Sequence, residues 1–339
     1  MQRLVLTMAA SIASLTMTSP ICAQSVAEFY AGKTVQMGVG YPSGGFDAYT
    51  RALARSIGKY IPGHPTVIVV NMPGASSFVY ARHLQTRARK DGTEFGMFDR
   101  GLIAKSLIEP QSVNLDFRKF AWVGSMNRET SACVMGNQKH VVAVSDLVKH
   151  QGDVVLGGVS RDGGGYVYTT LLQRMSPKNV RQVFGYGSTS DMVLAIERGE
   201  LDGSCFIYGT LKVNYPDQLA SGKLRAILQF SDSRSQDLPN VPTAYDVVTD
   251  EVDRKVIKFL ASPDVVGRPI VGPIDIPSDR VAALRKAFDE TVKDADFLDF
   301  TSKARMDMDA ISGADSAKIV DDIYSTSPDI IERARKILE

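Results

Sequence analysis

Four turns rich in Gly, Pro, Ser and Asn constrain the fold of this chain most, because each stands between a strand-like apolar run and a helical pattern. They lie at residues 42–45, 71–76, 160–166 and 185–189. Strand, turn and helix in this order form the repeating unit of a mostly parallel α/β sheet. Ligands bind to open sheets of this kind beyond the carboxyl ends of the strands, where these turns fall. The sequence therefore predicts an α/β fold whose site is built from turns.

The first turn belongs to the sequence Gly-Tyr-Pro-Ser-Gly-Gly-Phe-Asp at residues 40–47, which is typical of an anion site. It follows an apolar run at 35–39 and precedes a helical pattern at 48–60. The first amides of a helix lack intrahelical partners and carry the positive end of the helix dipole. Glycines let a ligand approach the backbone, and Ser43 or Asp47 can cap the helix. Taken alone, the turn fits a dinucleotide loop, a carboxylate site or an ordinary turn.

Sequence motifs for nucleotides, nucleophiles and metals do not occur in this chain. It has no G-x-G-x-x-G, Walker A or G-x-S-x-G sequence. Its four histidines stand outside the Gly-rich turns, and it has no His-Glu-x-x-His and no Cys/His cluster. The formal net charge is +1 with acidic and basic residues interleaved, which indicates no nucleic-acid partner. We expect no catalytic residue, no metal and no cofactor.

The N-terminal segment predicts export. Arg3 is its single charge, an apolar run at 4–17 follows, and Ala23 supplies a small residue for cleavage. Residues 1–23 are therefore interpreted as a signal peptide, which makes the mature protein periplasmic. A membrane anchor is an alternative, but the run is shorter than the roughly 20 apolar residues of a membrane span. A lipoprotein signal at Cys22 is a second alternative, although the residues before it are a poor lipobox.

Two cysteines remain after such a cleavage, Cys133 and Cys205. An oxidising compartment permits a disulfide between them. Two buried thiols in strands are the alternative, and sequence separation does not decide between the two.

The turns, in their order along the chain, resemble those of one family, the Bug-type extracytoplasmic solute receptors of tripartite tricarboxylate transporters. The motifs that carry the resemblance are Pro42-Ser43-Gly44-Gly45-Phe46-Asp47, Asn71-Met72-Pro73-Gly74-Ala75, Asp91-Gly92 before a strand, Gly185-Tyr186-Gly187-Ser188, and Leu238-Pro239-Asn240-Val241-Pro242-Thr243. The resemblance runs from about residue 29 to the C-terminus. Most relatives have one more residue between Gly-Gly and Asp in the first turn, and Gly where Ser76 stands. Phe46 and Ser76 are therefore expected to alter the shape of the pocket.

The resemblance implies a two-lobed periplasmic-binding-protein type II fold, a Venus flytrap with two crossover strands. Lobe one would comprise residues 24–126 and 226–339, including the C-terminal helices, and lobe two residues 127–225. The chain would cross near 125–132 and return near 224–230. Hinge closure would then trap a ligand between the lobes.

The same resemblance places a ligand between amides of the first turn and the 187–189 turn. We expect Ser43, Gly44, Gly45 and Phe46 to hold a carboxylate and Ser188 and Thr189 to face them. The full set of predicted ligand-binding residues is Tyr41, Ser43, Gly44, Gly45, Phe46, Asp47, Asn71, Ala75, Ser76, Arg100, Arg161, Gly164, Gly165, Tyr166, Tyr186, Ser188, Thr189 and Asp191. Helix stabilisation by Asp191 and exposed rim positions for Arg100 and Arg161 are the alternatives.

The function implied is a monomeric periplasmic receptor that captures a small organic carboxylate, either a dicarboxylate or an aromatic carboxylate, in the cleft between its lobes. It would deliver this ligand to a two-subunit membrane permease of the tripartite tricarboxylate type. Two alternatives stay open at this point. One is an exported enzyme that acts on a small carboxylate, with Asp191 or Tyr186 as acid or base. The other is a receptor that reports its ligand to a sensor kinase.

Overall fold

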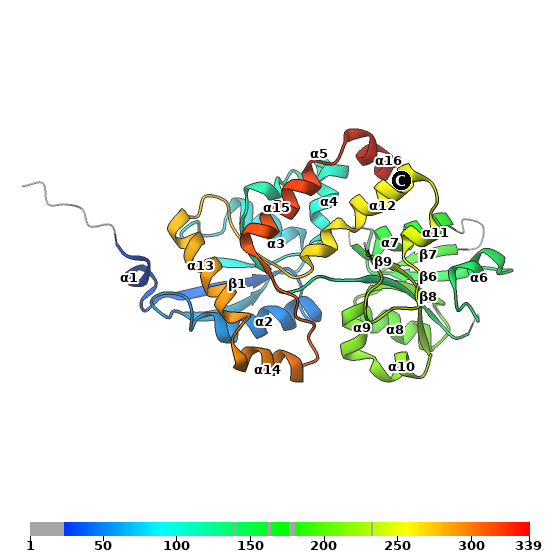
Figure 1. The fold of residues 1–339 in the computed structure, drawn as a ribbon, viewed down its shortest axis with the longest axis horizontal. Helices are drawn as coiled ribbons and strands as arrows, with labels where there is room; N and C mark the ends of the chain where they lie inside the picture. Colours follow the sequence, from blue (N-terminus) through cyan, green and yellow to red (C-terminus); the bar gives the residue numbers. More distant parts are fainter. Residues whose placement is uncertain (1–23, 139, 162–163, 176–179, 232) are drawn as a thin grey trace, which may run out of the picture.

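The computed structural model describes residues 24–138, 140–161, 164–175, 180–231 and 233–339 and shows two lobes side by side, each built on one β-sheet (Figure 1). The predicted signal peptide, residues 1–23, lies outside the described residues. In the described part of the chain, no helix has the length and apolar character needed to cross a membrane.

The sheet of lobe one has the strand order β11-β4-β10-β3-β1-β2. Its parallel part consists of β1 (Thr34–Val39), β2 (Thr66–Asn71) and β3 (Glu94–Met97). The antiparallel part consists of β4 (Ala121–Ser125), β10 (Pro269–Gly272) and β11 (Ile311–Ser312). Helix α2 (Gly45–Ile57) buries Tyr49, Leu53 and Ile57, which recur at helical spacing and therefore form one apolar face. The remaining elements of this lobe are α1 (Val26–Tyr30), α3 (Phe78–Thr86), α4 (Gly101–Ile108), α5 (Pro110–Val113), η1 (Phe117–Lys119), α13 (Ser278–Thr291), α14 (Ala295–Lys303) and α15 (Gly313–Tyr324).

The sheet of lobe two has the strand order β7-β6-β8-β5-β9. Strands β6 (Val154–Gly158), β7 (Val180–Phe184) and β8 (Gly203–Ile207) are parallel, whereas β5 (Ser131–Gly136) runs antiparallel to β8 and to β9 (Leu224–Phe230). The helices of this lobe are α6 (Val144–Lys149), α7 (Gly164–Met175), α8 (Thr189–Glu197), α9 (Tyr208–Asn214), α10 (Pro216–Ala220) and α11 (Ala244–Val247). Each sheet is thus parallel only in part, and the first strand after each crossing, β5 in lobe two and β10 in lobe one, runs antiparallel to its neighbours.

Two segments that connect the lobes, residues 126–130 and 262–268, lie against each other and form the hinge. Their backbones are bonded from Met126 N to Arg268 O at 3.0 Å, from Gly267 N to Asn127 O at 3.0 Å and from Glu129 N to Asp264 O at 2.8 Å. The first crossing is where the sequence predicts it. The predicted return near 224–230 is wrong, because β9 at these residues pairs with β5 of lobe two. Residues 226–230 therefore belong to the second sheet, and the return is made by 262–268.

Helices at the end of the chain connect the lobes on one side. Figure 1 shows α12 (Glu251–Ala261) leading from α11 in lobe two back toward lobe one, followed in sequence by η2 (Ser262–Val266). Helix α16 (Pro328–Leu338) packs on α12, α4 and α7, elements of both lobes.

Cys133 and Cys205 form a disulfide between β5 and β8. The two residues stand opposite each other in the antiparallel ladder, and both are buried. The disulfide, left open against two buried thiols by the sequence, is therefore present. It joins neighbouring strands of lobe two close to the hinge.

Candidate functional site

The first turn is held to the end of β2 by a small polar network. Asn71 donates from Nδ2 to Tyr41 O and to Asp47 Oδ1, both at 2.7 Å. Arg51 donates to the other Asp47 oxygen and to Asn71 Oδ1, each at 2.9 Å. Asp47 and Asn71, predicted to contact ligand, are thus occupied in fixing the turn. Ser43 and Gly44 remain exposed at its tip.

Tyr41 and Phe46 pack against each other beneath the turn, with ring centroids 4.8 Å apart. The Tyr41 hydroxyl donates to Asp99 Oδ2 at 2.5 Å. Burial and the Asp99 carboxylate raise the pKa of Tyr41, so this hydroxyl stays protonated and remains a donor. Phe46 is buried, with 7% of its surface exposed. The structure therefore places both aromatic rings in support of the turn.

A cavity of about 260 Å³ lies between the N-terminus of α2 in lobe one and α9 in lobe two. No side chain caps α2, and its N-cap Gly44 has φ 95°, in the left-handed region that favours glycine. Gly45 lies so close to the opposite wall that an added Cβ would be 2.8 Å from Arg268 Nη2 and 3.4 Å from Thr210 Oγ1. The first helical amides therefore face a small interlobe space. The lining residues are Gly44, Gly45, Asp47, Ala48, Tyr49, Gly209, Thr210, Val213, Asn214, Arg268 and Met306.

Arg268 forms the base of this cavity from the hinge. Its Nη2 lies 2.9 Å from Glu129 Oε1 in an ion pair whose side chains are 2% and 4% exposed. The guanidinium carbon lies 4.4 Å from the Phe46 ring centroid and 5.0 Å from that of Tyr49. Nε and Nη1 are buried and have no hydrogen-bond partner among the described residues. A buried cation thus lies beside the uncapped helix, with Nη2 as its atom nearest to Gly45.

The second and third turns meet across the lobes. Ser76 Oγ lies 3.0 Å from Ser160 Oγ. An added Cβ on Gly101, the first residue of α4, would be 3.6 Å from Gly164 Cα at the start of α7. Ala75 is exposed, and Ala75 and Ser76 both have left-handed φ values, 44° and 48°.

The polar side chains of the fourth turn form hydrogen bonds within the N-terminus of α8, the helix that follows it. Ser188 is the N-cap of α8, where its Oγ accepts from Asp191 N at 3.2 Å and lies 3.0 Å from Asp191 Oδ2. Asp191 therefore stabilises the helix start, the alternative that the sequence left open. Tyr186 packs against the apolar cluster under α8. Thr189 is half-buried as the first residue of α8. The lobe-two residues that line the described cavity belong to α9 instead.

Three further predicted residues have partners away from the cavity. Arg100 is buried and donates from Nε to Asp264 Oδ1 at 2.7 Å, which corrects the expectation that it is free for a ligand. Arg161 is exposed, with its guanidinium 5.6 Å from the Phe184 ring centroid. Tyr166 donates to Leu338 O of α16 at 2.5 Å, so its hydroxyl points to the C-terminal helix. Gly165, beside it, is exposed.

Comparison with known proteins connects this geometry to solved structures. No family model matches the sequence, and no curated protein sequence is significantly similar to it. The periplasmic binding protein BugD superposes with a TM-score of 0.67 at 20% identity, covering 91% of this chain and 98% of BugD. MatC from Rhodopseudomonas palustris with bound malate superposes with a TM-score of 0.66 at 18% identity, covering 91% of this chain and 99% of MatC. An R. palustris protein with adipate superposes with a TM-score of 0.67 at 17% identity, covering 90% of this chain and 96% of that protein.

The chain has the fold of these two-lobed periplasmic binding proteins. In such a fold, the space between the lobes is the natural ligand site, since closure about a hinge buries the ligand from both sides. The cavity at α2 and α9 lies in this space, and Arg268 belongs to the hinge itself.

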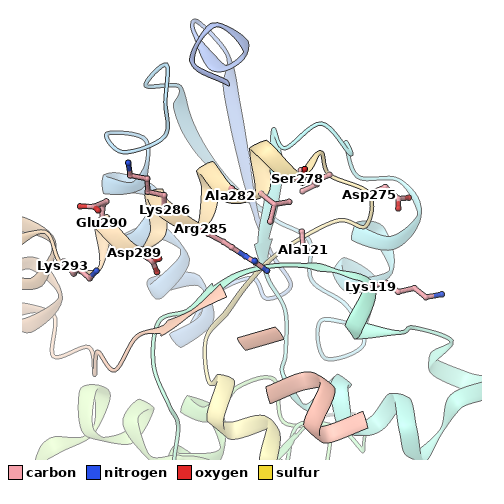
Figure 2. Close-up of a pocket in the computed structure, with 12 residues that line it drawn as sticks. Lys119, Ala121, Asp275, Ser278, Ala282, Arg285, Lys286, Asp289, Glu290 and Lys293 are labelled. Atoms are coloured by element: carbon pink, nitrogen blue, oxygen red, sulfur yellow. The ribbon is translucent and has the colours of Figure 1, made fainter. Parts of the chain in front are cut away.

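A larger hollow of about 680 Å³ lies outside this interlobe space, on the outer face of lobe one (Figure 2). It is lined by α13 and neighbouring segments, with charges of both signs. Figure 2 shows Lys119, Lys286 and Lys293 extending outward from the ribbon. Burial raises the pKa of the Asp289 carboxyl there, against the opposing effect of Lys293. Mixed, outward-directed charge is typical of a solvated surface, and we assign no ligand to this hollow.

Sequence reasoning missed Arg268, Thr210 and Asn214. A signal for Arg268 was present, because it is a single charge within the apolar stretch 265–272. Arginine is almost never fully buried without a partner, so this pattern predicts an ion pair or a site. Thr210 and Asn214 lie in a polar segment whose sequence carries no comparable signal. Among the described residues, no group of three or more His, Cys, Asp or Glu side chains is placed to hold a metal.

Proposed function

We propose that this protein is a solute receptor that binds a small organic carboxylate in the cavity between its lobes. The observation that carries the proposal is the uncapped N-terminus of α2, which faces that cavity beside the buried Arg268. Helix amides and a guanidinium are both strong carboxylate donors. The solved structures with malate and adipate support the same ligand class.

The proposal also states where the receptor works, to which partner it delivers its ligand and in which oligomeric state. The receptor works in the periplasm after removal of residues 1–23 and delivers its ligand as a monomer to a two-subunit permease of the tripartite tricarboxylate type. The periplasmic neighbours support the compartment. The permease and the monomeric state rest on the sequence resemblance.

Calorimetric titration of the purified mature protein with a panel of small carboxylates tests the proposal. We expect saturable binding of at least one acid, with the acid recovered unchanged after incubation. Mass spectrometry of any ligand that copurifies provides a second route to its identity. Chemical conversion of the acid, or no binding of any acid to protein shown to be ligand-free and folded, would contradict the proposed function.

A further inference from the structure

Arg268 has hydrogen-bonding capacity that the fold leaves unused. A guanidinium carries five N–H donors. The Glu129 carboxylate forms an ion pair with Nη2, while Nε and Nη1 have no hydrogen-bond partner among the described residues. Buried donors without partners are costly, more so when they are charged. A ligand oxygen that reaches these buried nitrogens would therefore gain free energy that an ordinary surface contact does not offer.

The helix amides converge on the same position. Helix α2 is 13 residues long, and no side chain of the described residues is hydrogen-bonded to its first amides. Gly45, its first residue, has no side chain to separate the helix from the Nη2 atom, which is 2.8 Å from where a Cβ would stand. A carboxylate in the cavity can thus accept from the helix terminus and from Arg268 together.

Two aromatic rings hold the guanidinium in place. Its central carbon lies 4.4 Å from the Phe46 centroid and 5.0 Å from that of Tyr49, which are favourable cation–π distances. Phe46 therefore serves the site by orienting Arg268, since its own side chain is buried. A cation that is oriented before binding loses little freedom when the ligand arrives.

The rest of the cavity offers no second cation. Apart from Arg268, Asp47 is the only charged residue among those described as lining it, and Arg51 and Asn71 already hold its carboxylate. Thr210 and Asn214 provide uncharged polar groups on the α9 side. A second carboxylate on the ligand would lie near the negative charge of Asp47 and would find no cation of its own among these lining residues, which is unfavourable. A volume of about 260 Å³ also falls below the usual size of roughly 300–1,000 Å³ for ligand pockets.

From these observations we infer that Arg268 is the carboxylate anchor of the receptor and that its ligand is a small monocarboxylate with an uncharged polar group, such as a hydroxyl, directed toward α9. The inference rests on the proposed function and narrows its ligand class. It differs from a site for a dicarboxylate, which would need a cation or helix terminus at each end.

Calorimetry with lactate, 3-hydroxybutyrate, succinate and malate tests this inference. We expect at least one hydroxy-monocarboxylate to bind, and both dicarboxylates to bind about tenfold more weakly or not at all. The Arg268→Gln variant is expected to lose about 30-fold or more in affinity for the preferred acid. Gly45→Ala should also weaken binding while the charge is retained, because its methyl group enters the space beside Nη2.

Two variants keep this test independent of folding. Arg268→Gln leaves Glu129 buried without its cation, so the double variant Arg268→Gln/Glu129→Gln removes both charges and should bind as weakly as the single variant. Arg128→Gln is the matched control: this hinge arginine pairs with Asp309 at the surface and should bind like the wild type. Circular dichroism confirms that each variant is folded.

The outcomes separate the two proposals. If the wild type binds an acid and the double variant binds it equally well, Arg268 is not the anchor, and the proposed function still holds. Tighter binding of succinate or malate than of the monocarboxylates overturns the assigned ligand class. If the folded, ligand-free wild type binds no carboxylate in the wider panel, the proposed function fails and this inference with it.

Discussion

Arg100 and Arg268 are both buried, and both form an ion pair with a carboxylate of the hinge, yet their surroundings differ. Arg100 pairs with Asp264, and neither residue is among those with a buried, unpartnered side-chain atom in the described structure. Arg268 pairs with Glu129 and keeps two unpartnered nitrogens. A complete network stabilises a joint, whereas an incomplete one beside a cavity is suited to binding. The comparison therefore suggests a structural role for Arg100 and the proposed binding role for Arg268.

The Asp264 carboxylate shows how complete its network is. It accepts from Arg100 Nε at 2.7 Å, from Ser131 Oγ at 2.6 Å and from Tyr168 Oη at 2.8 Å. Arg100 lies in lobe one, Ser131 and Tyr168 lie in lobe two, and Asp264 lies in the hinge segment. Burial opposes the charge on Arg100, but Asp264, Glu129 and Asp99 outweigh it and raise the pKa of its guanidinium. This cluster therefore connects the two lobes through one carboxylate.

Asp264→Asn should have the largest effect on stability. The substitution leaves the buried Arg100 without its counter-charge, and breaking a buried ion pair costs about 3–5 kcal/mol. Urea unfolding of the mature protein, followed by circular dichroism, measures the change in the free energy of unfolding. A loss below about 1 kcal/mol would mean that Asp264 is not central to the joint. By comparison, the double variant Arg268→Gln/Glu129→Gln should lose less stability, since it leaves no orphaned charge.

Tyr168→Phe should have a smaller effect in the same network. It removes one hydrogen bond to an ionised group, worth about 1.5–3 kcal/mol, and leaves the ring in place. Burial and the Asp264 charge raise the pKa of Tyr168, so the hydroxyl is protonated at any pH of interest. The loss of stability should therefore stay constant between about pH 6 and pH 9. A loss that varies steeply over this range would point to another titrating group.

The sequence predicts the folding pattern better than the site, and the two buried arginines show why. Alternating strands, helices and Gly-rich turns are local signals, so the α/β class, a helix after the first turn and the first crossing could be predicted. The start of that helix was not, because α2 begins at Gly45 and not at residue 48. The return crossing could not, because β9 reads as an apolar strand whichever sheet receives it. Arg100 was expected at the site and Arg268 was not. Their roles depend on Asp264 and Glu129, which the fold brings to them from distant positions in the sequence.

Asp309→Asn should have the smallest effect, and it gives the surface reference for both buried pairs. Arg128 Nε lies 3.1 Å from Asp309 Oδ2 near the hinge, but the two side chains are 53% and 64% exposed. Water and salt screen such a pair, which is worth about 0–1 kcal/mol. Urea unfolding at low and high salt should show a small loss for Asp309→Asn that vanishes at high salt, whereas the loss in Asp264→Asn should persist. If both losses vanished with salt, the network around Asp264 would be open to water, and its contrast with Arg268 would not hold.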